Sequence, residues 1–196
     1  MEVEGFGTKA PAPRLLRVEP GVVAACVKWA RDCADYRGYA KQNDKWRRGL
    51  KGPMSLLGGY ETRADFTGLA IGKVAEWYAA KLFGVEIDLR FLPHGDGGVD
   101  LHLPCGPSQV KNNSNAAARM LVKVGSRELR VADWFIATKW NGTEPCVSVL
   151  GYAHRQQVSE SPIEDGIGNW KNHVVSICSL RPIGALLAIR PIAEVI

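Results

Sequence analysis

Apolar residues recur at helical intervals in two stretches of the N-terminal half. The first stretch, residues 22–39, carries one apolar face formed by Val22, Val23, Cys26, Val27, Ala30 and Cys33. The second, residues 68–83, is rich in Ala, Leu, Trp and Tyr, with Asp65 or Thr67 as a candidate N-cap and Gly84 as its expected end. Apolar side chains surround this second helix on nearly all sides, so we expect it to be largely buried.

Shorter stretches with strand-like patterns follow the second helix. Strands are predicted at residues 85–91, 99–103, 108–112, 131–140, 146–152 and 173–178, and short helices at 115–122 and 183–189. Residues 104–107 read Pro-Cys-Gly-Pro, a composition typical of a turn, which predicts a hairpin between the second and third strands. The order of elements predicts an α/β fold with a mixed central sheet flanked by helices.

The N-terminal segment differs from the rest of the chain. Residues 1–21 contain three prolines and two glycines before Gly21, with little periodicity, so we expect a loose lead-in. A chain of 196 residues is long enough for one well-buried core and short for two. We therefore divide the chain into an N-terminal arm and helical extension (1–60) and a main part (61–196), within one compact domain.

Composition limits the class of protein. Hydrophobic residues make up 46% and charged residues 23%, which is typical of a folded soluble chain. The five cysteines are scattered without a C-x-x-C pair, which favours reduced thiols over a zinc site. No apolar run reaches the roughly 20 residues that span a bilayer, and residues 1–7 lack the basic start and apolar core of a signal peptide. The expected location is cytoplasmic, with no membrane partner.

The net charge of +5 is compatible with a polyanionic partner, because Lys and Arg neutralise phosphates. The basic residues gather most densely in residues 41–51, which offer Lys41, Lys45, Trp46, Arg47, Arg48 and Lys51 as candidate nucleic-acid contacts. Basic residues interleaved with an aromatic suit the backbone and bases of nucleic acid. The alternative is a solvated connector with one buried tryptophan.

Candidate chemistry is concentrated in residues 94–111. Side chains of a strand alternate between faces, so Gln109 and Lys111 point the same way, and Asp100 on the adjacent strand of the hairpin can reach that face. Hard cations such as Mg²⁺ prefer oxygen ligands, which the Asp100 carboxylate, the Gln109 side chain and the Val110 backbone carbonyl can supply. A cation held there would polarise a phosphate, and Lys111 would orient the attacking water or offset charge in the transition state. Asp96, followed by two glycines, fits a turn better than a ligand.

Glu76 lies in the middle of the second predicted helix. A carboxylate on a buried helix is costly unless it is paired or bound to metal. One interpretation is that it belongs to the metal site. The other, favoured by helical position alone, is an i,i+3 ion pair with Lys73.

Together, a helical Glu, the sequence G-D-G-G-V-D and then Q-V-K after a short hairpin resemble the PD-(D/E)XK nucleases, closest to the Mrr-like endonucleases and the Holliday-junction resolvase-like proteins. The resemblance covers residues 66–152. It implies a restriction-endonuclease-like fold for the main part and Mg²⁺- or Mn²⁺-dependent cleavage of DNA, and it suggests a possible homodimer. The roles it implies are Asp100 as central metal ligand, Gln109 as second ligand, Lys111 as catalytic lysine and Glu76 as helical acid.

One departure from the common family pattern stands at Gln109, which replaces an acid, as it does in the Mrr-like branch. The site therefore has one fewer negative charge, and the rival hypothesis is a nuclease fold that binds nucleic acid without cutting it. The sequence motifs of several other enzyme classes are absent from this chain. The chain has no phosphate loop of the G-x-x-x-x-G-K-[S/T] type, no G-x-G-x-x-G and no G-x-S-x-G, which excludes the usual NTPase, dinucleotide-binding and serine-hydrolase signatures.

Overall fold

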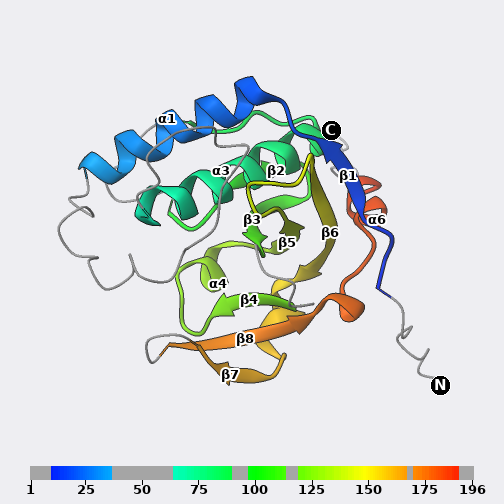
Figure 1. The fold of residues 1–196 in the computed structure, drawn as a ribbon. Helices are drawn as coiled ribbons and strands as arrows, with labels where there is room; N and C mark the ends of the chain where they lie inside the picture. The colour runs from blue at the N-terminus through cyan, green and yellow to red at the C-terminus, as the bar shows by residue number, and fades with distance from the viewer. Residues whose placement is uncertain (1–9, 37–63, 90–96, 114–118, 167–169, 190–196) are drawn as a thin grey trace, which may run out of the picture.

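A mixed five-stranded sheet forms the centre of the molecule (Figure 1). The computed structural model describes residues 10–36, 64–89, 97–113, 119–166 and 170–189. The strand order is β1 (Arg14–Arg17), β6 (Cys146–His154), β5 (Trp134–Lys139), β3 (Gly106–Asn112) and β2 (Leu101–Leu103). Only the neighbours β3 and β5 run parallel, and the other three pairs are antiparallel. The predicted α/β class with a mixed sheet is confirmed.

The predicted hairpin is confirmed as β2–β3. Leu103 is paired with Gly106, so the turn consists of Pro104 and Cys105 alone. The Asp100 backbone N–H donates to the Ser108 carbonyl at 2.9 Å, which extends the pairing one residue before β2 begins. Asp100 is thereby fixed beside the first half of β3.

Both long helices are confirmed, as α1 (Pro20–Tyr36) and α3 (Ala64–Phe83). Because α3 begins at Ala64, Asp65 and Thr67 lie inside the helix, and the predicted cap at either residue is wrong. Gly84 follows Phe83 with φ 67°, a left-handed conformation that glycine adopts without steric cost. The inner turns of α3 are fully covered, as expected from their composition, at Ala70, Val74, Ala75, Tyr78 and Ala79.

The N-terminal segment belongs to the same packed unit as the sheet. β1 is paired with β6 from Arg14 to Arg17, so the interpretation of residues 1–21 as a loose lead-in is wrong for this part, while residues 1–9 lie outside the described residues. Helix α1 then crosses over α3 (Figure 1), and the two helices share a core with Trp140 and Val147. Over residues 10–36 the predicted extension is therefore an integral part of the fold.

A second sheet covers the other face of the first. Its order is β4 (Arg119–Lys123), β8 (Lys171–Ser176) and β7 (Ile163–Asp165), all antiparallel. Phe135 and Ala137 of β5 point into this layer, where they join a core with Met120, Val122 and Val175. The layers are thus helices, mixed sheet and second sheet (Figure 1). Helices therefore flank the mixed sheet as predicted on the α1–α3 side, whereas the described helices on the second side are the short α4 (Glu128–Val131) and α5 (Arg155–Ser159).

Two local predictions are wrong. The helix predicted at 115–122 is strand β4 over Arg119–Lys123, and residues 114–118 lie outside the described residues. Residues 85–89 alternate between half-buried and exposed positions as predicted, yet they form no ladder with another described strand. The remaining predictions shift by a few residues, with β8 followed by a 3-10 turn (Ile177–Ser179) and by α6 (Ile183–Leu187). No helix in the described ranges combines the length and apolar character needed to cross a bilayer.

Candidate active site

Asp100 and Gln109 meet across the β2–β3 hairpin. Oδ2 of Asp100 accepts hydrogen bonds from Nε2 of Gln109 at 2.5 Å and from the Val110 backbone N–H at 2.7 Å. The register explains this contact, because Asp100 is bonded through its own N–H to Ser108, the residue before Gln109. Three of the predicted site residues are therefore adjacent.

The Gln109 side chain leaves one oxygen without a partner. Gln109 as a whole is 8% exposed, and its Oε1 is buried with no hydrogen-bond partner. A buried amide oxygen that makes no hydrogen bond costs free energy, about 1–3 kcal/mol in typical cases. A cation at this position would satisfy the oxygen, and oxygen donors such as the Asp100 carboxylate and the Gln109 amide are the ligands that Mg²⁺ prefers.

Lys111 lies on the same face of β3 as Gln109, since alternate residues of a strand share a face. Its neighbour Val110 points the other way, into the core beneath α3. Nζ of Lys111 lies 2.7 Å from Oε1 of Glu128, the first residue of α4, and both side chains are about one-fifth exposed. Lys111 is thus held in place by a carboxylate that the sequence analysis did not single out.

The approach of α4 to the hairpin depends on Gly98. This glycine has φ 90°, and a Cβ added there would lie 3.1 Å from the Glu128 backbone nitrogen and 3.2 Å from its Cα. Any larger residue would push the start of α4 away from the segment that leads into Asp100. Gly98 therefore brings Glu128 close enough to contact Lys111.

Glu76 lies on a different side of the sheet. It forms an ion pair with Lys73 on α3, the helix that packs on the face to which Val110 points. Nζ of Lys73 also lies 4.4 Å from the centre of the Trp29 ring on α1. Burial raises the pKa of the Cys26 thiol on α1 to about 12, and the Glu76 carboxylate adds to the rise while Lys73 lowers it. These contacts place Glu76 at the α1–α3 interface and favour the ion-pair interpretation.

Replacing Glu76 by Gln separates the two interpretations. We expect DNA cleavage per folded molecule to stay within about twofold of the unchanged chain, while the free energy of unfolding falls by about 3–5 kcal/mol because the nearly buried ion pair between Lys73 and Glu76 is lost. Metal-dependent nicking and urea denaturation measure the two effects. A large loss of cleavage by fully folded Glu76→Gln protein would return Glu76 to the active site.

Several predicted contacts lie outside the described residues. These are the residues of the basic segment, Lys41, Lys45, Trp46, Arg47, Arg48 and Lys51. Asp96, which was predicted to belong to a turn, lies outside the described residues as well. Within the described part of the chain, no three His, Cys, Asp or Glu side chains are grouped closely enough to hold a metal ion. A cation at the hairpin would therefore depend on a mixed set of donors: the Asp100 carboxylate, the Gln109 oxygen and the Val110 carbonyl.

Comparisons with known proteins gave no match: no family model, no curated protein and no solved structure was found to be similar to this chain.

Proposed function

We propose that this protein is a metal-dependent endonuclease that hydrolyses DNA phosphodiester bonds on a restriction-endonuclease-like fold. The observation that carries the proposal is the buried, unpartnered Oε1 of Gln109, on the side chain whose Nε2 donates to the Asp100 carboxylate. A carboxylate and an amide that can each offer an oxygen, near the strand face that also carries Lys111, suit a divalent cation and a phosphate together.

The donors fit a hard cation. Asp100 and Gln109 would hold Mg²⁺ or Mn²⁺ with the Val110 carbonyl, and the cation would supply Lewis-acid chemistry to the scissile phosphate. With Gln109 in place of an acid, Asp100 is the one negative ligand among these three. The Asp100 charge therefore contributes most of the electrostatic attraction for the cation in this proposal.

Lys111 would act on the phosphate. Its ammonium lies on the Gln109 face of β3, where it can offset the negative charge that develops on the phosphate oxygens. Glu128 holds this ammonium at 2.7 Å, so it would act as a positioning residue. A bound phosphate would then share Nζ with Glu128.

The proposed substrate class rests on the net charge of the protein and on its prediction as one compact domain. A net charge of +5 favours a polyanion, and backbone contacts fix position without reading sequence. We therefore propose recognition of DNA structure or backbone, with a homodimer as the assembly that would cut two strands. A nuclease fold that binds DNA without cutting it is the rival proposal.

A nicking assay tests the proposal directly. Supercoiled plasmid is incubated with the full chain in Mg²⁺, in Mn²⁺ and in EDTA, and relaxed and linear products are measured on gels. We expect cleavage in one or both metals and none in EDTA, and a loss of about a hundredfold or more in Lys111→Ala. Binding without cleavage in either metal, unchanged by Lys111→Ala, would instead support the rival.

A further inference from the structure

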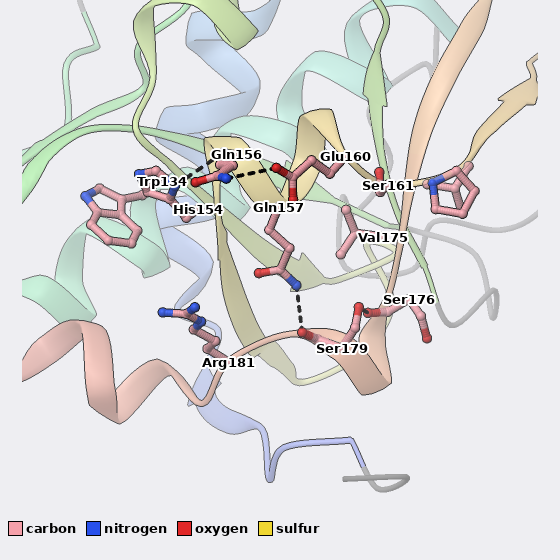
Figure 2. A pocket seen from close by; sticks show the side chains of 12 residues that line it. Trp134, His154, Gln156, Gln157, Glu160, Ser161, Val175, Ser176, Ser179 and Arg181 are labelled. Atoms are coloured by element: carbon pink, nitrogen blue, oxygen red, sulfur yellow. Dashed lines mark hydrogen bonds between the residues drawn. The ribbon is translucent and has the colours of Figure 1, made fainter. Parts of the chain in front are cut away.

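A pocket of about 750 Å³ opens at the end of the sheet where β5 begins and β6 ends. It lies between these strands, α5, β8 and the segment that leads to Arg181 (Figure 2). Its volume falls within the roughly 300–1,000 Å³ of small-molecule sites. None of its lining residues belongs to the candidate active site, so the pocket needs a separate explanation.

One side of the pocket is aromatic and fixed. The rings of Trp134 and His154 lie 5.0 Å apart at 68° to each other. Nε1 of Trp134 donates to the Cys105 carbonyl at 3.0 Å, and Nδ1 of His154 accepts from the Gln156 backbone N–H at 3.3 Å. These bonds hold both rings before any ligand arrives, so little conformational entropy is lost on binding.

The polar groups of the pocket are complementary to an anion and to an amino group. The Arg181 backbone is anchored to Tyr152 by two hydrogen bonds of 2.9 and 3.0 Å, whereas its guanidinium makes no ion pair with the residues that the structure describes. Gln157 donates from Nε2 to the Ser179 carbonyl at 2.8 Å, which turns its oxygen toward the side of Trp134, His154 and Arg181 (Figure 2). The one acid in the lining, Glu160, accepts from Gln156 at 2.8 Å.

We propose that this pocket binds a nucleotide, with the base against the Trp134–His154 wall and the phosphate on the Arg181 guanidinium. Aromatic rings stack on any base, and a planar guanidinium matches phosphate oxygens with paired hydrogen bonds. The Gln157 oxygen accepts a hydrogen bond from an exocyclic amino group, which favours adenine or cytosine over bases with a carbonyl at that position. The nucleotide is either free or part of a single strand, since both present the same groups.

The experiment uses the full chain in EDTA, so that cleavage does not interfere. Calorimetric titrations compare AMP with adenosine, ribose 5-phosphate and IMP. Fluorescence anisotropy compares a labelled oligo(dA) of eight nucleotides with an abasic strand of the same length. Arg181→Gln is the test variant, and Arg14→Gln, which changes an exposed arginine on β1, is its matched control.

We expect the nucleotide form to bind at least about tenfold more tightly than each fragment, because the phosphate bond to Arg181 and the base stack act together. IMP should bind less tightly than AMP. Arg181→Gln should lose about tenfold in affinity, and Arg14→Gln should lose none. Saturable AMP binding identifies a free nucleotide as a ligand, whereas Arg181-dependent binding of oligo(dA) alone identifies a strand.

Three results would overturn the proposal: no saturable binding of either AMP or oligo(dA), equal losses in Arg181→Gln and Arg14→Gln, or equal affinity for the abasic and adenine-bearing strands when AMP does not bind. The proposal for the pocket and the proposal for the nuclease site can be refuted independently of each other. Asp100→Asn should leave nucleotide affinity unchanged, and absent plasmid cleavage would say nothing against binding measured in EDTA.

Discussion

Replacing Asp100 by Asn is expected to reduce metal-dependent nicking by about a hundredfold or more. The substitution keeps the size of the side chain and an oxygen that can accept from the Val110 N–H, so the hairpin should remain intact. It removes the one negative charge among the three proposed ligands, and a loss of about 3 kcal/mol in transition-state stabilisation corresponds to that factor. The rate of plasmid nicking at saturating Mg²⁺ and Mn²⁺ measures the effect.

The matched control is Asp32→Asn on α1. Its carboxylate is about half exposed and forms a surface ion pair with Lys28, so its loss should change neither cleavage nor stability appreciably. Circular dichroism of both variants checks that the fold persists. Full cleavage by Asp100→Asn protein would remove the hairpin from the chemistry and with it the proposed function.

Truncating Trp140 to Ala should produce a large loss of stability. Trp140 is fully buried between α1, α3 and the sheet, and its indole N–H donates to the Glu144 carbonyl at 2.9 Å. The substitution leaves a cavity where two helices meet the sheet and removes that hydrogen bond. We expect the free energy of unfolding to fall by about 3–5 kcal/mol, measured by urea denaturation.

Trp170→Ala is the matched control, because it makes the same substitution at an exposed position. Trp170 is 52% exposed and its ring contacts Lys123, so its loss should cost about 1 kcal/mol or less. Similar losses in the two variants would mean that Trp140 does not connect the helical layer to the sheet. A smaller loss in Trp140→Phe than in Trp140→Ala would support the cavity explanation.

The elements that could be predicted from sequence are those with a strong local signal. Helix α3 has an apolar surface on nearly all sides and a glycine at its end, and the β2–β3 hairpin has turn residues between two strand-like runs. The contact of Asp100 with Gln109 followed from the alternation of side chains in that hairpin. In each case the determining information lies within about 20 residues of sequence.

The elements that were missed depend on distant partners. Strand β4 has buried Met120 and Val122 alternating with exposed neighbours, but the exposed Leu121 hides the alternation and the preceding alanines favour a helix. Strand β1 exists because β6 pairs with it, about 130 residues later. Glu128 stands on a four-residue helix, too short to show a period, so only the close approach at Gly98 shows its place beside Lys111.

The path of the chain between β3 and β5 has a consequence for how the protein is made. The chain leaves the mixed sheet after β3, forms the edge strand β4 of the second sheet, and returns through α4 to β5, whereas the central strand β8 comes some fifty residues later. During synthesis, Phe135 and Ala137 emerge before the strand that completes their cover, so an apolar face stays open until β8 has emerged from the ribosome. The two sheets should therefore become stable together, late in folding. A nascent chain halted before β8 would expose an apolar surface that chaperones bind.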